Sequence, residues 1–399
     1  MALAHYDIII VGGNIVGATL ANLLAGSNLK IALLESQEPV FAPLSEHYNL
    51  RVSALTQASL DILQQLDVWQ NLQDQRVGPF TQMYVWDSNS QAHIEFKSAE
   101  AGLAQLGHIV ENNLMQQALW NKLQKDSRVQ LFTGVALAKL KLEPDRVTAT
   151  LENGQSLTAS LVVGADGINS KVRELAGMAV DSKSYGHTAI VATVKTANSH
   201  RQTAWQCFLP YGILAFLPLA DEHSCSIVWS CETATAERLS ALDEMGFAMA
   251  LQEVFYEHLG SIELISKRLS FPLTMRHVRQ YVLPRVALVG DAAHTLHPLA
   301  GQGLNLGLGD ADCLAQQVLL TAERGRDIGL LSNLRPYERW RKKQNLSMIV
   351  AMQGFKELFA SSFRPIVWLR AKGLTVVNNF NLLKYFFVRR ANVRRTKSL

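Results

Sequence analysis

The sequence predicts an α/β fold in which a nucleotide-binding type of parallel sheet carries an inserted antiparallel sheet. Three observations predict it. An apolar run that ends in glycines opens the chain at residues 6–13, as at the start of a βαβ unit. Alternating strands dominate residues 185–275, and a second buried run at 286–289 leads into another glycine-containing loop. Nucleotide-type segments therefore flank the antiparallel part, which indicates an insertion.

We expect three parts. The nucleotide-binding domain would comprise residues 1–75, 100–182 and 277–335. The inserted substrate domain would comprise residues 76–99 and 183–276. Residues 336–399 would form a C-terminal helical segment with a basic tail. A length of 399 residues suits two domains, and 48% hydrophobic against 18% charged residues permits a large core. No Pro/Ser/Gly-rich linker separates the parts, which favours a shared cleft.

The elements follow from the spacing of apolar residues. The first βαβ unit is predicted from strand 6–11, helix 15–24 and strand 30–34. Residues 52–68 and 111–125 have helical spacing. Further strands are predicted at 82–87, 128–133, 136–142, 146–151, 156–163, 187–195, 203–209, 213–219, 224–230 and 286–289. Helices occupy most of the remaining C-terminal part.

The first motif is a glycine-rich turn after the first strand, which resembles GxGxxG. Its residues are Gly12, Gly13, Asn14 and Gly17, with Asn14 in place of the middle glycine. Such glycines let the backbone approach a pyrophosphate at a helix N-terminus, and Glu35, at the end of the second strand, could accept hydrogen bonds from a ribose. Asn tolerates left-handed dihedral angles, so the turn can survive, although the side chain crowds the phosphate path. The alternative is a plain βα turn.

The second motif is the Gly-Ala-Asp-Gly turn at 164–167, where a strand ends at Asp166 and a helix begins near Ser170. Taken alone, it indicates an Asx-turn that caps a helix.

The third motif starts at Gly290-Asp291 and continues into a glycine-rich loop that opens a helix at about Gly303. Its candidate residues are Gly290, Asp291, Pro298, Gly301, Gly303, Leu304 and Asn305. Backbone amides at a helix start carry partial positive charge, which suits a developing anion.

With these three motifs in this order, the chain resembles the single-component FAD-dependent aromatic hydroxylases of the para-hydroxybenzoate hydroxylase type. That resemblance implies a Rossmann-like FAD-binding domain of the glutathione reductase type. It implies that the Gly12–Gly17 loop and Glu35 bind the ADP half of FAD and that Asp166 serves both FAD and the reducing nucleotide. Asp291 would contact the ribityl chain, and Arg51 would bridge FAD to the first helical segment.

The resemblance also implies the surroundings of the flavin ring. Amides from Gly301 to Asn305 would stabilise negative charge on the N1–C2=O edge, and Pro298 would shape the adjacent wall. Phrases such as LRVSAL (50–55), GHIVEN (107–112) and GDAAHTLHPLAGQGLNLG (290–307) are most similar to the bacterial ubiquinone-biosynthesis hydroxylases. Among these, residues 107–112 and 225–230 most resemble the 2-polyprenylphenol hydroxylases.

Such an enzyme reduces FAD with transient NADPH or NADH, reacts it with oxygen, and transfers OH from a flavin hydroperoxide to the ring. The implied substrate is a polyprenylphenol-type lipid, and an assembly of ubiquinone-biosynthesis proteins is an implied partner. No nucleic-acid partner is predicted, and a homo-oligomer stays open. A same-fold flavin reductase and a flavin-free scaffold member are alternatives, while halogenation is disfavoured because the WxWxIP stretch is absent.

No catalytic residue is assigned. His187 and His297 are candidates for a base that activates the phenol, but for each a structural histidine bonded to the backbone is the stronger interpretation. Trp205 and Trp229 fit sheet-core aromatics better than a substrate clamp. The four cysteines form no CxxC pair or zinc spacing, so no metal site is predicted, and free thiols favour the cytoplasm.

The charge is unevenly distributed. After Glu357 the chain has nine cations and no acidic residue, so a net charge of +4 divides into −5 before this point and +9 after it. The nine cations are Arg364, Arg370, Lys372, Lys384, Arg389, Arg390, Arg394, Arg395 and Lys397. Interleaved apolar residues predict peripheral contact with the inner face of the bacterial inner membrane. The alternative is a helix pair packed on the FAD domain with a frayed end.

Overall fold

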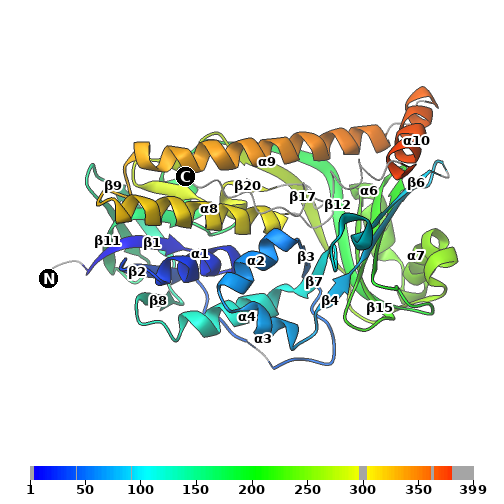
Figure 1. The fold of residues 1–399 in the computed structure, drawn as a ribbon, viewed down its shortest axis with the longest axis horizontal. Helices are drawn as coiled ribbons and strands as arrows, with labels where there is room; N and C mark the ends of the chain where they lie inside the picture. The colour runs from blue at the N-terminus through cyan, green and yellow to red at the C-terminus, as the bar shows by residue number, and fades with distance from the viewer. Residues whose placement is uncertain (1–3, 42, 91, 296–302, 361–363, 380–399) are drawn as a thin grey trace.

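The computed structural model describes residues 4–41, 43–90, 92–295, 303–360 and 364–379, and its strands form three sheets (Figure 1). Within these residues the helices are α1 (Ile15–Ala25), α2 (Gln57–Gln65), α3 (Trp69–Gln73), α4 (Asn112–Leu123), α5 (Lys171–Leu175), α6 (Thr233–Ala241), α7 (Glu244–Leu259), α8 (Gly303–Glu323), α9 (Leu331–Ala360) and α10 (Arg364–Asn379). None of these helices is both long and apolar enough to cross a bilayer.

The first sheet is the nucleotide-binding type that the sequence predicts. Its strands are β1 (Ala4–Val11), β2 (Ile31–Glu35), β8 (Val129–Thr133), β9 (Leu137–Leu142), β10 (Val147–Leu151), β11 (Ser156–Gly164), β18 (Val282–Leu283) and β19 (Val286–Leu288). The central order β19-β11-β1-β2-β8 is parallel throughout. Ile8, Ile9 and Ile10 are fully buried, as expected for a strand covered on both faces. Helix α1 packs against α4 and α8.

The second sheet is antiparallel except where β5 runs parallel to β13. Its strands are β5 (Gln82–Asp87), β6 (His93–Lys97), β12 (Val180–Thr196), β13 (Thr203–Leu209), β14 (Gly212–Pro218), β15 (Ser224–Glu232), β16 (Ile262–Leu264), β17 (Leu269–Val278) and β20 (His294–Thr295). Helix α7 covers its outer face, where Phe247 and Phe255 pack with Trp229 in one core. The other face turns toward the first sheet (Figure 1).

A small third sheet joins β3 (Val52–Leu55), β7 (Gly107–Glu111) and β4 (Gly78–Phe80). It corrects the expectation of one helix over 52–68, because the helix α2 starts only at Gln57. Residues 52–55 instead pair with β7, which the sequence analysis did not predict as a strand. Pairing with a distant segment outweighed the local helical spacing.

The C-terminal helices bear on the interpretation of the tail as a packed helix pair. Helix α9 packs against α8 and β18 of the first sheet's domain, and helix α10 packs against α9 and against β6 of the second sheet. Its Arg370 is 3% exposed and pairs with the buried Asp87, with Nε 2.8 Å and a terminal nitrogen 3.1 Å from the carboxylate oxygens. Arg370 is therefore part of the core and is unavailable to an anionic surface. Residues 380–399, with the six last cations of the tail, lie outside the described residues.

Candidate active site

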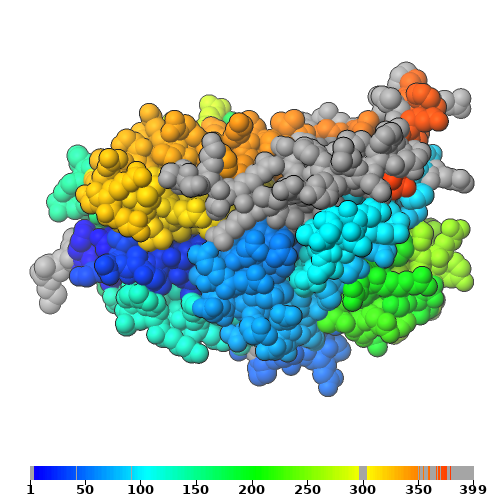
Figure 2. All heavy atoms as spheres, in the orientation of Figure 1, coloured from blue at the N-terminus to red at the C-terminus, as the bar shows by residue number. Residues whose placement is uncertain are grey.

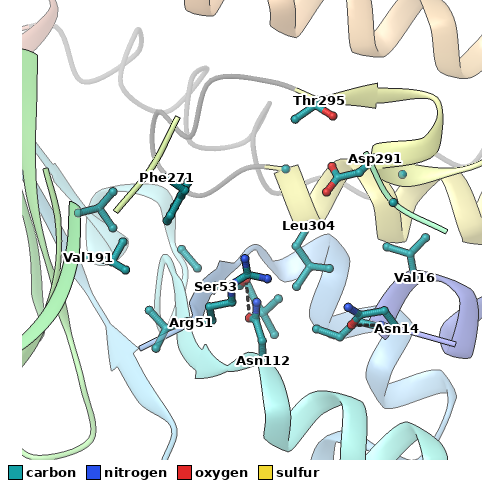
Figure 3. A pocket seen from close by; sticks show the side chains of 18 of the residues that line it. Asn14, Val16, Arg51, Ser53, Asn112, Val191, Phe271, Asp291, Thr295 and Leu304 are labelled. Atoms are coloured by element: carbon teal, nitrogen blue, oxygen red, sulfur yellow. Dashed lines mark hydrogen bonds between the residues drawn. The ribbon is translucent and has the colours of Figure 1, made fainter. Parts of the chain in front are cut away.

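A cavity of about 1060 Å³ lies between the parallel sheet and the inner face of the antiparallel sheet (Figure 3). Loops that follow β1, β2, β11 and β19 line one side, together with the start of α8. The cavity brings together most of the residues that the sequence singles out. Those that line it are Gly12, Asn14, Glu35, Arg51, Asp166, Gly290, Asp291, Gly303 and Leu304.

The glycine turn is tight because the backbone of a second loop lies against it. Gly12 has φ +102°, and a Cβ on it would lie 2.4 Å from the Ala165 carbonyl oxygen. A Cβ on Gly17 would lie 1.9 Å from the Gly12 carbonyl oxygen. Only glycine fits at either position, and the contact joins the first motif to the second.

Asn14 occupies a different conformation from the one the sequence suggested. Its φ of −71° is not left-handed, since Gly12 supplies the positive φ of the turn. The Asn14 side-chain oxygen accepts a hydrogen bond from the Ile15 amide at 2.7 Å, as an N-cap of α1. Asn14 thus orders the start of the helix, although its side chain also lines the cavity (Figure 3).

The glycine turn after β1 also holds the Glu35 carboxylate in place. Its Oε2 accepts from the Gly13 amide at 2.7 Å, and Oε1 accepts from the Gln37 amide at 3.2 Å. Trp120 of α4 completes the support, because its indole nitrogen donates to the Gly13 carbonyl at 2.6 Å. No sequence signal singled out Trp120, whose partner is 107 residues away.

The two carboxylate oxygens of Asp166, a residue that lines the cavity, have different surroundings. Oδ2 accepts from the amides of Lys171 and Val172 at 2.7 and 3.1 Å, and Ser170 also caps α5 through the Arg173 amide. The interpretation of Asp166 as a residue that caps a helix therefore accounts for Oδ2 only. Oδ1 is buried and has no hydrogen-bond partner in the structure, so it can still accept a hydrogen bond.

Asp291 lies in the short helical turn 290–292 that follows β19, and it opens onto the cavity (Figure 3). Surrounding protein raises the pKa of its carboxyl through desolvation, whereas His294 and Arg51 lower it. Arg51 reaches the cavity from the loop before β3, so it faces Asp291 across the region between the two sheets.

The start of α8 is held in place by Asn305. The Asn305 side-chain oxygen accepts from the Ser59 hydroxyl at 2.7 Å and the Thr56 amide at 3.1 Å, and its nitrogen donates to the Ala54 carbonyl at 2.8 Å. Gly303 has open space where a Cβ would lie. Pro298 and Gly301 lie outside the described residues, as does His297.

A buried ionic cluster behind the Asp291 loop was not predicted. Asp310 of α8 is fully buried and accepts from the Gly290 amide at 3.0 Å, from His294 at 2.6 Å and from Arg341 of α9 at 2.6 Å. Burial alone would raise the pKa of Asp310, but His294 and Arg341 hold it well below its usual range. The sequence signal that could have indicated this cluster is an acidic residue, Asp310, on an otherwise apolar helix face.

The structure also gives positions for His187, Trp229 and Trp205. His187 does not line the cavity, and its ring Nδ1 donates to the Tyr185 carbonyl oxygen at 2.7 Å, which matches the structural interpretation. Trp229 is 1% exposed within the sheet core. Trp205, in contrast, lines the cavity while stacking on His258.

These features fit a phosphate-bearing dinucleotide such as FAD. The two glycines of the turn exclude side chains, Gly303 leaves the start of α8 open, and Asp166 has an unused acceptor. Within the described residues no cluster of metal-ligating side chains occurs.

Comparisons with known proteins agree with this geometry. Residues 5–343 match the family described as FAD binding domain. The chain is 37% identical over 385 residues to ubiquinone hydroxylase UbiL of Rhodospirillum rubrum, covering 96% of this chain and 89% of that protein. It is 35% identical over 378 residues to 3-demethoxyubiquinol 3-hydroxylase of Escherichia coli, covering 95% and 96%.

A solved structure shares the fold. The p-nitrophenol 4-monooxygenase PnpA of Pseudomonas putida superimposes with a TM-score of 0.80 at 18% identity, covering 99% of this chain and all of that one. The chain therefore belongs to the FAD binding domain family and, within it, to the FAD-dependent hydroxylases of ubiquinone biosynthesis.

Proposed function

We propose that this protein hydroxylates the ring of a polyprenylated phenol, using FAD, NADPH or NADH, and oxygen. The observation that supports it most is a single cavity with two unlike sides. Loops suited to a dinucleotide form one side, and the inner face of the antiparallel sheet forms the other. A flavin and a ring substrate could therefore meet in one enclosed space.

The sheet side of the cavity is neutral and mostly apolar. Its described lining residues include Val191, Leu217, Val228 and Phe271 and no charged side chain. The charged residues that line the cavity are Glu35, Arg51, Glu152, Asp166, Lys171 and Asp291, which come from the other elements. An uncharged ring with an apolar substituent suits such a wall, because an unpaired charge there would be costly.

Two hydroxyl groups on this wall, those of Ser226 and Thr295, have no hydrogen-bond partner among the described residues. Ser226 is 1% exposed, lines the cavity, and its hydroxyl has no hydrogen-bond partner in the structure. A polar group on the substrate could satisfy it. The names of the two bacterial relatives, both ubiquinone-pathway hydroxylases, support a quinone-type ring.

The residues that line the cavity would bind different parts of FAD. The Gly12–Gly17 turn and Glu35 would hold the ADP half of FAD, Asp291 and Arg51 the middle, and the amides at the start of α8 the flavin edge. Bound FAD would supply the redox chemistry: the ring C–H, oxygen, NAD(P)H and a proton give ring C–OH, water and NAD(P)⁺. The sheet would exclude water from the ring. The oxygen-transfer route that the resemblance implies is part of this proposal.

The peripheral position on the inner membrane face and the assembly with other pathway proteins belong to the same proposal. They are supported by the lipid-soluble ring that the relatives' names indicate. The expected domain boundaries stay a prediction. The contact through residues 380–399 concerns residues outside those described.

Deletion of the gene, followed by mass spectrometry of accumulated quinone precursors, tests the proposed substrate. We expect the unhydroxylated polyprenylphenol to accumulate and to disappear when the gene is restored. Accumulation of a precursor that already has one added oxygen would instead indicate a different ring carbon.

A further inference from the structure

We propose that the outward face of α9 docks the protein on an anionic lipid surface. This face, called here the α9 stripe, consists of Arg335, Arg339, Lys343, Leu346 and Val350. The inference rests on the proposed function, because a polyprenyl chain cannot leave a bilayer without a large loss of apolar burial. None of the five residues lines the cavity, so the stripe is separate from the candidate active site.

The five residues share one side of the helix. Their spacing of four, four, three and four places them within about one third of the helix circumference at 3.6 residues per turn. The stripe is about 22 Å long, at 1.5 Å per residue. All five residues are exposed, Leu346 to 47% and Val350 to 64%. Helix α9 runs along one long edge of the molecule, where its side chains reach the surface (Figures 1 and 2).

The three cations of the stripe have no acidic partner among the described residues. Between residues 331 and 350 the sequence contains one acidic residue, Glu338, whose carboxylate accepts from the Tyr281 amide at 2.7 Å. The other two cations of this segment are used by the fold, since Arg341 pairs with Asp310 and Lys342 donates to a backbone carbonyl. The stripe is thus a line of positive charge that the molecule does not neutralise.

The apolar end of the stripe favours a lipid surface over an acidic protein or a nucleic acid. Leu346 and Val350 follow the cations on the same face, and α10, which contacts α9, exposes Trp368 to 62%. Lys372 lies near the Trp368 ring. Exposed apolar and aromatic side chains beside cations are the composition of segments that lie in a membrane interface.

The test uses the full-length, FAD-loaded protein and co-sedimentation with phosphatidylcholine vesicles, with and without about one third phosphatidylglycerol. The variant Arg335→Ser/Arg339→Ser/Lys343→Ser removes the charge of the stripe. The control Lys30→Ser/Lys125→Ser/Lys139→Ser removes three exposed cations elsewhere and has the same net charge. Leu346→Ser/Val350→Ser tests the apolar end.

We expect the native protein to bind only the anionic vesicles. The stripe variant should lose about 100-fold in affinity, because each cation near an anionic leaflet is worth about fivefold. The control should keep the native affinity, and the apolar variant should bind more weakly. Binding of the native protein to neither vesicle, or equal losses in the stripe variant and the control, would overturn the proposal.

A parallel assay separates this inference from the proposed function. The same preparations are given 2-geranylphenol, a short-chain phenol that needs no vesicle, and the hydroxylated product is measured. Product formed by both the native protein and the stripe variant, together with unchanged vesicle binding in the variant, would overturn the docking surface alone. Failure of the native protein to form product would count against the proposed function.

Discussion

Asp166 shows how one carboxylate can serve a helix and a ligand together. Two amides of α5 occupy Oδ2, whereas Oδ1 is buried and unpaired in a residue that lines the cavity. An unpaired buried acceptor is costly in a folded protein, so a bound donor is the physical reason to keep it. The proposed donor is a hydroxyl of FAD or of the reducing nucleotide.

The variant Asp166→Asn should therefore weaken FAD binding by about tenfold, because a charged acceptor is replaced by a neutral one. The Asn oxygen can still accept from the α5 amides, so the fold should survive. Titration of the apoprotein with FAD, followed by quenching of flavin fluorescence, measures the affinity.

Ser170→Ala is the matched control. It removes the hydroxyl that accepts from the Arg173 amide and should lower the free energy of unfolding by about 1 kcal/mol. FAD affinity should not change. Equal FAD affinities in Asp166→Asn and the native protein would remove Asp166 from the site.

Asp310 should make a large contribution to stability through its ionic cluster. Asp310→Asn leaves Arg341 buried beside a neutral partner and should lower the free energy of unfolding by about 3–5 kcal/mol at pH 7. Urea denaturation measures this value. Asp145→Asn, at an exposed position, is the control and should change little.

The effect of Asp310 should also depend on pH in a known direction. His294 and Arg341 keep the pKa of this carboxyl below its usual range against the effect of burial. Its contribution is therefore complete above the unfolded pKa of about 4 and is lost as the pH falls below that value. The difference in free energy of unfolding between the native protein and Asp310→Asn should be smaller at pH 3 than at pH 7. A difference that stays constant between pH 7 and pH 3 would contradict this role.

At the residue scale, the sequence could predict which strand ends converge but not what supports them. Glu35 ends a parallel strand, and Asp166 and Asp291 follow two others. Parallel strands end at the same sheet edge, so the meeting of these three residues was predictable. Asp310 and Trp120 act on loops through partners far along the chain, and no local pattern encodes those pairs.

At the scale of elements, prediction was reliable where local pattern and tertiary contact agree. The strand 82–87 was predicted with the bounds that the structure shows, and the start of a helix was predicted at about Gly303, where α8 begins among the described residues. Residues 52–55 have helical spacing but become a strand, because β7 offers a pairing partner. Whether such a segment pairs depends on a strand that its own sequence does not contain.

Helix α10 should depend on the buried ion pair between Arg370 and Asp87 of the second sheet. Arg370→Met leaves the buried Asp87 carboxylate without its cation, and should lower the free energy of unfolding by about 3–5 kcal/mol. Amide hydrogen exchange should rise in α10 and β6 before it rises in β1. The double variant Asp87→Asn/Arg370→Gln should recover part of the loss, since no single buried charge remains. Unchanged protection of α10 in Arg370→Met would show that the ion pair does not hold the helix.

At the scale of the whole molecule, the insertion places an apolar sheet face opposite a set of dinucleotide-type loops. Segments at both ends of the first 335 residues complete the parallel sheet, and the antiparallel strands between them form the opposite wall. Neither wall alone could both hold a dinucleotide and shield a lipid ring. The cavity between them supports the proposed transfer of oxygen to a ring over simple flavin reduction.

Oxygen labelling can show whether the protein inserts an atom of O₂ into a ring. Purified, FAD-loaded protein is given 2-geranylphenol, NADPH or NADH, and ¹⁸O₂, and the product is analysed by mass spectrometry. We predict a hydroxylated ring that contains one ¹⁸O atom, formed only when the reducing nucleotide is present. Oxidation of NAD(P)H without a labelled ring product would contradict the account and indicate a flavin reductase on the same fold.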